Sequence, residues 1–231
     1  MLQRGERMKK RTAALISLFA IPLVIVIGNK VFNDKQYAFI SAAVVILSLV
    51  QFFLSFERKE NAGTKLVLIA VMTALSIAGR MIFAVIPGFK PVTAIVVVTA
   101  IYFGKESGFI TGAMSALLSN FYFGQGPWTP FQMLTWGLIG WFAGVFSSQL
   151  KNSRIYLTVY ALLSGIAYSL LMDVWSTLWF DGVFNVRRYL YTVFTAMPFT
   201  AIYAVSNIIF LLLITKPIGK KLERIRIKYG L

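Results

Sequence analysis

Long apolar stretches alternate with short polar ones along almost the whole chain. Eight apolar segments can be marked, at residues 12–28, 38–56, 66–87, 92–104, 107–121, 131–149, 155–180 and 189–215. A helix needs about 20 apolar residues to cross the hydrocarbon of a bilayer, so the fourth and fifth segments are short for a full crossing. The pattern predicts an all-α integral membrane protein with about eight spans.

Composition supports insertion into a membrane. Of the 231 residues, 58% are hydrophobic and only 13% are charged, whereas a soluble domain is about a quarter charged. The apolar run from Ala13 to Ile27 follows a basic N-terminus, but no small-residue cleavage pattern comes after it, so we expect a retained span. The chain has no cysteine and no histidine, which excludes disulfides and thiolate zinc sites and removes the commonest general base.

Lysine and arginine are concentrated in alternate polar stretches, chiefly 4–11, 58–65, 151–154 and 216–228. Cytoplasmic loops of membrane proteins carry an excess of these residues. The distribution therefore predicts a multi-pass protein of the cell membrane with both termini in the cytoplasm. It also places the polar stretch from Asn120 to Trp136 on the outer side.

The first two apolar segments differ from the others. They carry almost no polar residues and no tryptophan, and they end in a hydrophilic linker at 57–65. We therefore divide the chain into an N-terminal transmembrane hairpin with its linker, residues 1–60, and a six-helix membrane core with a basic tail, residues 61–231. All five tryptophans lie in this core.

The stretch from Asn120 to Trp136 combines aromatic rings and amides with residues that interrupt helices. Glycine or proline at 124, 126, 127 and 130 predicts a loop. Rings with one polar end collect at the membrane–water boundary, and amides beside them could hold a small molecule. The alternative is a plain interfacial turn. The candidate binding residues here are Asn120, Tyr122, Gln125, Trp128, Thr129, Gln132 and Trp136.

Two charged residues, Arg80 and Asp173, lie deep within apolar segments. Each is seven residues from the expected outer end of its helix, which corresponds to a depth of about 10 Å. Equal depth and opposite charge predict a pair, either a salt bridge for packing or the floor of an outward-facing pocket. The set of candidate binding residues is completed by Phe89, Lys90, Trp179 and Arg187.

Enzyme chemistry has little support in the sequence. The phosphate-binding pattern Gly-x-x-x-x-Gly-Lys-Ser/Thr does not occur, and Gly104-Lys105 is followed by Glu106. Asp173 is the only acidic residue in an apolar segment, so a hydrolase with paired carboxylates is not expected. We predict no catalytic residue, no metal site and no cofactor. An intramembrane enzyme that uses Asp173 or a serine and a structural protein of the cell envelope remain alternatives.

Several short patterns occur in a characteristic order. They are the alanines Ala70, Ala74 and Ala78 on one helix face, the sequence Ile-Pro-Gly-Phe-Lys-Pro at 86–91, the stretch 102–112 with Phe103, Gly104 and Gly112, and Trp136 to Gly144 after the outer stretch. With these patterns, residues 65–216 resemble the substrate-binding S-components of energy-coupling factor (ECF) transporters. The six spans usual in that family leave the hairpin as a departure.

The resemblance implies a non-catalytic subunit of an ABC-type importer that captures a vitamin on the outer face. It would deliver the vitamin inward together with a transmembrane coupling subunit and two ATPase subunits, which would use the ATP. Ala70, Ala74 and Ala78 would be the docking surface for the coupling subunit. Chain length and the outer stretch are most similar to the cobalamin-type members, while riboflavin, queuosine precursors and other vitamins stay open.

Overall fold

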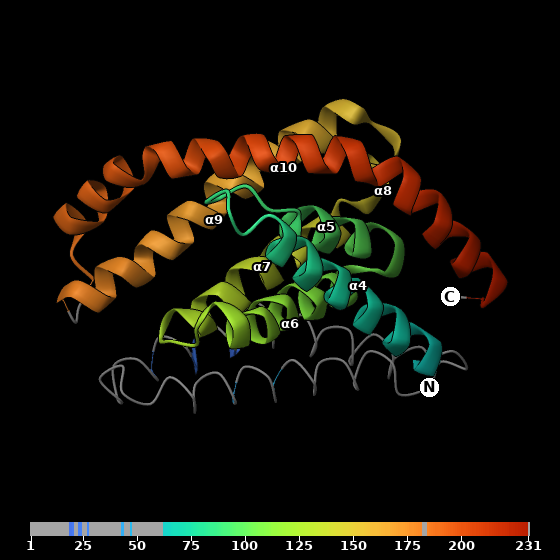
Figure 1. The fold of residues 1–231 in the computed structure, drawn as a ribbon, viewed down its shortest axis with the longest axis horizontal. Helices are drawn as coiled ribbons and strands as arrows, with labels where there is room; N and C mark the ends of the chain where they lie inside the picture. Colours follow the sequence, from blue (N-terminus) through green and yellow to red (C-terminus); the bar gives the residue numbers. More distant parts are fainter. Residues whose placement is uncertain are drawn as a thin grey trace.

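The computed structural model describes residues 62–181 and 184–230, together with the isolated positions 19, 20, 23, 24, 27, 43 and 47. Over the two long ranges the chain forms seven helices and no strand, which confirms the all-α prediction for this part of the chain. The helices are α4 (Ala62–Ile82), α5 (Val92–Phe103), α6 (Lys105–Phe123), α7 (Trp128–Val145), α8 (Ser147–Asn152), α9 (Arg154–Asp181) and α10 (Val186–Lys228) (Figure 1). The predicted hairpin at 1–60 falls outside the two ranges.

Three of these helices are long and apolar enough to cross a membrane, namely Gly63–Ile82, Arg154–Asp181 and Val186–Lys228. The structure therefore supports a multi-pass membrane protein. Of the roughly eight predicted spans, these three correspond to described helices whose length and composition suit a membrane crossing. The last of them, α10, has 43 residues and is about 65 Å long, twice the thickness of the hydrocarbon layer.

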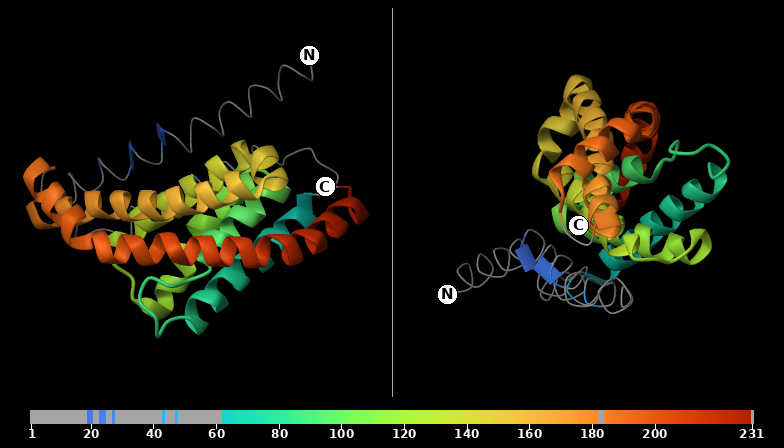
Figure 2. Two further views of the ribbon diagram at one scale, coloured as in Figure 1. Left: turned by 90° about the horizontal axis from the view of Figure 1, so that it is seen from above. Right: turned by 90° about the vertical axis from the view of Figure 1, so that its left-hand side faces the viewer.

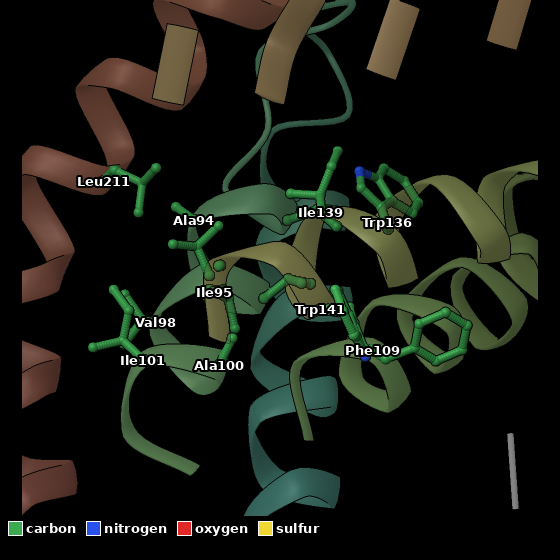
Figure 3. Packing of buried hydrophobic residues seen from close by; sticks show 14 of the residues in the cluster. Ala94, Ile95, Val98, Ala100, Ile101, Phe109, Trp136, Ile139, Trp141 and Leu211 are labelled. Atoms are coloured by element: carbon green, nitrogen blue, oxygen red, sulfur yellow. The ribbon is translucent and has the colours of Figure 1, made fainter. Parts of the chain in front are cut away.

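The short helix α5 lies at the centre of the described fold. Eleven of its 12 residues are buried, and it packs against α4, α6, α7 and α10. A helix that is apolar on every face is stable when other elements surround it. Figure 3 shows Ala94, Ile95, Val98 and Ile101 of α5 grouped with buried side chains of α6, α7 and α10. The short apolar segment at 92–104 is thus an internal helix about 18 Å long.

The helices pack most extensively in two pairs, α6 with α7 and α9 with α10. Figures 1 and 2 both show α9 and α10 side by side. Between α6 and α7 the backbones approach at glycines, because a Cβ atom on Gly108 would lie 2.7 Å from the carbonyl oxygen of Gly140. Gly144 likewise faces the backbone of Lys105. These small residues permit the close helix contact that their spacing predicts.

The stretch 120–136 is mainly helical, so the prediction of a loop there is wrong. Its first residues, up to Phe123, end α6, and its residues from Trp128 onward begin α7. Only residues 124–127 connect the two helices, and Gly124 has a φ of 99°. Pro127 precedes α7 and Pro130 lies in its first turn, where the missing N–H has no helical partner to lose.

Candidate functional site

One cavity lies where five helices, α4, α5, α7, α9 and α10, meet the connection between α4 and α5. It contains about 490 Å³ of empty space, part of it open to solvent. The cavity lies at the start of α5 and at the C-terminal end of α4. Its lining residues are Arg80, Gly88, Lys90, Val92, Thr93, Gln132, Trp136, Tyr168, Tyr203 and Asn207.

Flat aromatic rings form one side of this cavity. Trp136 of α7 stacks on Tyr168 of α9, with ring centroids 5.1 Å apart and an interplanar angle of 25°. Tyr203 of α10 meets Tyr168 edge to face at 5.1 Å. Stacked and edge-to-face rings are favourable arrangements for aromatic pairs. The group Trp136, Tyr168 and Tyr203, here called the aromatic wall, offers a surface for a planar ligand.

A chain of hydrogen bonds joins four helices behind the cavity. The guanidinium Nη1 of Arg80 donates to Asn120 Oδ1 at 2.8 Å and also to the hydroxyl of Ser119. Asn120 Nδ2 donates to Gln132 Oε1 at 2.9 Å, and Gln132 Nε2 donates to the Tyr168 hydroxyl at 3.2 Å. The chain therefore runs from α4 through α6 and α7 to α9. It fixes the side chains that line the cavity.

Asn120 is the centre of this chain. It is fully buried, and Nδ2 donates a second hydrogen bond to Thr129 Oγ1 at 2.9 Å. The Thr129 hydroxyl in turn donates to Gln125 Oε1 at 3.0 Å, and Gln125 Nε2 donates to the Leu117 carbonyl at 2.8 Å. A buried amide is tolerated when its donors and acceptor are all engaged. Asn120 meets this condition.

The connection between α4 and α5 is held against α10. Gly88 has a φ of 78°, and a Cβ atom there would come within 3.0 Å of Ile202. The hydroxyl of Ser206 accepts from the Lys90 N–H at 2.9 Å and donates to the Lys90 carbonyl at 3.2 Å. Phe89 packs on Phe210 with centroids 4.9 Å apart. These contacts set the position from which the Lys90 side chain enters the cavity.

Two cations, Arg80 and Lys90, contribute to the cavity lining. The Arg80 side chain is 6% exposed, and its Cζ lies 4.5 Å from the centroid of the Phe123 ring. Lys90 Nζ lies 5.6 Å from the same centroid. Burial, and to a lesser extent the charge of Arg80, lowers the pKa of Lys90 to about 8.

The predicted pairing of Arg80 with Asp173 is wrong. Among the described residues, the ion pairs within 4.0 Å are Lys151–Glu223 and Arg188–Asp181. Asp173 is buried, and its Oδ2 has no hydrogen-bond partner in the described part of the chain. Equal depth in two helices does not bring side chains together, because each helix must also present the residue to the same neighbours.

The other predicted binding residues fall into three groups. Gln132 and Trp136 line the cavity with Arg80 and Lys90, while Asn120, Gln125 and Thr129 lie behind it in the hydrogen-bond chain. Phe89 packs against α10, and Trp128 packs edge to face on Trp175 at 5.9 Å. The residues Asp173, Tyr122, Trp179 and Arg187 do not line the cavity, and the last three are exposed.

The sequence-based set omitted six residues that line the cavity. Gly88, Val92 and Thr93 lie in or next to the 86–91 pattern, while Tyr168, Tyr203 and Asn207 are polar residues within long apolar helices. Polar groups in spans normally face the interior of the bundle. Extending that criterion from charged residues to tyrosine and asparagine would have identified the residues from α9 and α10.

The long apolar helices indicate a multi-pass membrane protein, and its polar and aromatic lining makes the cavity the candidate site for a small molecule. A family model described as "ECF-type riboflavin transporter, S component" matches residues 60–224. The chain therefore belongs to this family of S components, which are transport subunits that work with ECF coupling and ATPase subunits. The match is to the riboflavin type and does not support the cobalamin type. Comparisons with curated proteins and with solved structures gave no match.

Proposed function

We propose that this protein is the substrate-binding subunit of an ECF importer and that it captures a flavin in the cavity beside the aromatic wall. The isoalloxazine ring of a flavin is flat and would stack on the side formed by Trp136, Tyr168 and Tyr203. The amides of Gln132 and Asn207 at the cavity surface would bind its polar edge. The observation that carries the proposal is this stacked wall next to fixed polar groups, in a chain of the riboflavin-type family.

The lining of the cavity favours a flavin over a corrinoid. The aromatic wall suits a flat molecule of three fused rings. A corrinoid is several times larger and carries amides around its whole edge. The amide side chains in the lining are Gln132 and Asn207, which are too few to pair with such an edge.

We also propose that one face of α4 docks the coupling subunit, with the cavity on the outer side and both termini in the cytoplasm. Ala70, Ala74 and Ala78 are exposed along this face, as are Val67 and Val71. Small side chains let a second helix come close, and close packing is a main source of association energy in a bilayer. Arg80, through which α4 contributes to the cavity, is buried, whereas these alanines are exposed, so docking and ligand binding would use different faces of the helix.

The test is ligand binding by the full chain purified in detergent. Small molecules released on denaturation should include a flavin by mass spectrometry, and added riboflavin should quench tryptophan fluorescence. Tyr168→Leu, which removes one ring of the aromatic wall, should weaken binding at least about tenfold. The matched control is Tyr156→Leu, because Tyr156 is an exposed tyrosine of the same helix. The absence of any flavin, bound or added, would refute the proposal.

A further inference from the structure

The cavity has an excess of positive charge that riboflavin, an uncharged molecule, would not compensate. Arg80 and Lys90 both line it, and no described residue in its lining is acidic. Neither cation takes part in an ion pair within 4.0 Å among the described residues. Removing a charge from water is costly unless an opposite charge compensates it. Among the described lining residues, therefore, no carboxylate compensates the two positive charges.

The guanidinium of Arg80 and the backbone of Lys90 are both held by hydrogen bonds. The Arg80 guanidinium is held through Nη1 by Ser119 and Asn120, and its buried Nε has no hydrogen-bond partner in the described part of the chain. The backbone N–H and carbonyl of Lys90 are both bonded to Ser206. A guanidinium with free donors is suited to bind phosphate or carboxylate oxygens through more than one bond.

The two cations also interact unfavourably with each other. Their charged groups approach the same ring, that of Phe123, and the charge of Arg80 contributes to the lowered pKa of Lys90. The aromatic ring offsets part of this repulsion through its negative face. An anion that contacts both groups would offset the repulsion between them. It would also replace the favourable interactions with water that the two cations lose when they are buried. The free protein therefore holds a prepared site for negative charge.

We infer that the ligand of this cavity carries an anionic group, a phosphate monoester or a carboxylate, which binds between Arg80 and Lys90 while its ring system stacks on the aromatic wall. The inference rests on the proposed function and adds a substrate class to it: acidic flavins are preferred over riboflavin. The acidic residues of α9, Asp173 and Asp181, do not line the cavity, and neither forms an ion pair within 4.0 Å with Arg80 or Lys90.

The experiment compares two ligands that differ only by the charged group. Riboflavin and riboflavin 5′-phosphate are titrated against the full chain in detergent, and binding is followed by quenching of flavin fluorescence. The phosphate ester should bind at least about tenfold more tightly at pH 7, and its advantage should shrink as salt is added. Inorganic phosphate alone should compete with the ester far more weakly, since it lacks the ring.

Two variants test the cations individually. Lys90→Gln removes one charge, and Asn120→Asp places a carboxylate where Asn120 Oδ1 lies 2.8 Å from Arg80 Nη1, which neutralises the other. Each should reduce the preference for the ester, the ratio of the dissociation constants of the two flavins measured on the same variant, at least about threefold. Lys90→Arg keeps the charge and should keep the preference. Lys220→Gln, which removes an exposed cation from α10, is the matched control.

The outcomes separate this inference from the proposed function. Equal affinity for the two flavins, or tighter binding of riboflavin, would overturn the inference and leave the proposed function intact. Failure of the protein to bind either flavin would refute both. A preference for the ester that survives in Lys90→Gln and in Asn120→Asp would show that the charge is bound elsewhere, and this assignment would then be wrong.

Discussion

Replacing Asn120 with leucine removes the centre of the hydrogen-bond chain at nearly constant side-chain volume. Three hydrogen bonds are lost, one from Arg80 at 2.8 Å and two to Thr129 and Gln132 at 2.9 Å each. Because leucine fills the same space, the effect comes from polar groups left without partners rather than from a cavity. The buried guanidinium loses one of its two acceptors, and this is the largest single loss.

The expected size follows from the kinds of bond that are broken. Hydrogen bonds between side chains in membrane bundles contribute about 0.6 kcal/mol each, and a bond to a charged group contributes about 1.5–3 kcal/mol. The free energy of unfolding of Asn120→Leu should therefore fall by about 2–4 kcal/mol. For a protein of this size, that corresponds to a decrease in melting temperature of roughly 4–16 °C.

The assay is thermal unfolding in detergent, followed by the fluorescence of tryptophan. All five tryptophans lie in the core, and Trp136 lines the cavity that the hydrogen-bond chain supports, so the signal follows unfolding of the core as a whole. Asn152→Leu is the control, because Asn152 is an exposed asparagine at the end of α8. A loss below about 1 kcal/mol for Asn120→Leu, equal to that of the control, would refute the view that this chain holds the four helices together.

Three further results are expected. The affinity for riboflavin 5′-phosphate should fall as pH rises through about 8, because Lys90, which lines the cavity with Arg80, Tyr168 and Tyr203, then loses its proton. The affinity for riboflavin, measured in parallel, should show no such fall. The stability changes of Arg80→Met and Asp173→Asn should add in the double variant, since the two groups form no ion pair, and a coupling above about 1 kcal/mol in thermal unfolding would contradict this. Ala74→Trp should abolish assembly with the coupling subunit in pull-down assays while flavin binding is retained, and loss of binding with intact assembly would show that this face has another role.

Features of the fold that depend on one helix alone could be predicted from the sequence. The apolar segment at 92–104 predicted a helix, and its apolar character on every side explains why α5 is enclosed. Gly140 and Gly144 lie four residues apart on one face of α7, a spacing typical of close helix packing, and both face the backbone of α6. The loop prediction failed because proline is compatible with the first turn of a helix, as Pro130 shows.

The site could be predicted only where a residue was conspicuous by its own chemistry. Arg80 stood out as a charge in an apolar segment, and it lines the cavity. Asp173 met the same criterion and does not, because the position of α9 relative to α4 is set by packing with other helices. That Tyr168 and Tyr203 form one wall with Trp136 became apparent only when α7, α9 and α10 were placed together. Their role depends on neighbours that are far away in the sequence.

The way the cavity is assembled bears on how the protein acquires its function during synthesis. Its lining extends from Arg80 in α4 to Asn207 in α10, and Ser206 holds Lys90 across 116 positions of the chain. Contacts between such distant residues form late in folding. A nascent chain that ends before α10 lacks one side of the cavity and cannot hold a ligand there. Ligand binding therefore requires that the whole core has been synthesised and packed. A bound ligand would stabilise this complete fold rather than any part of it.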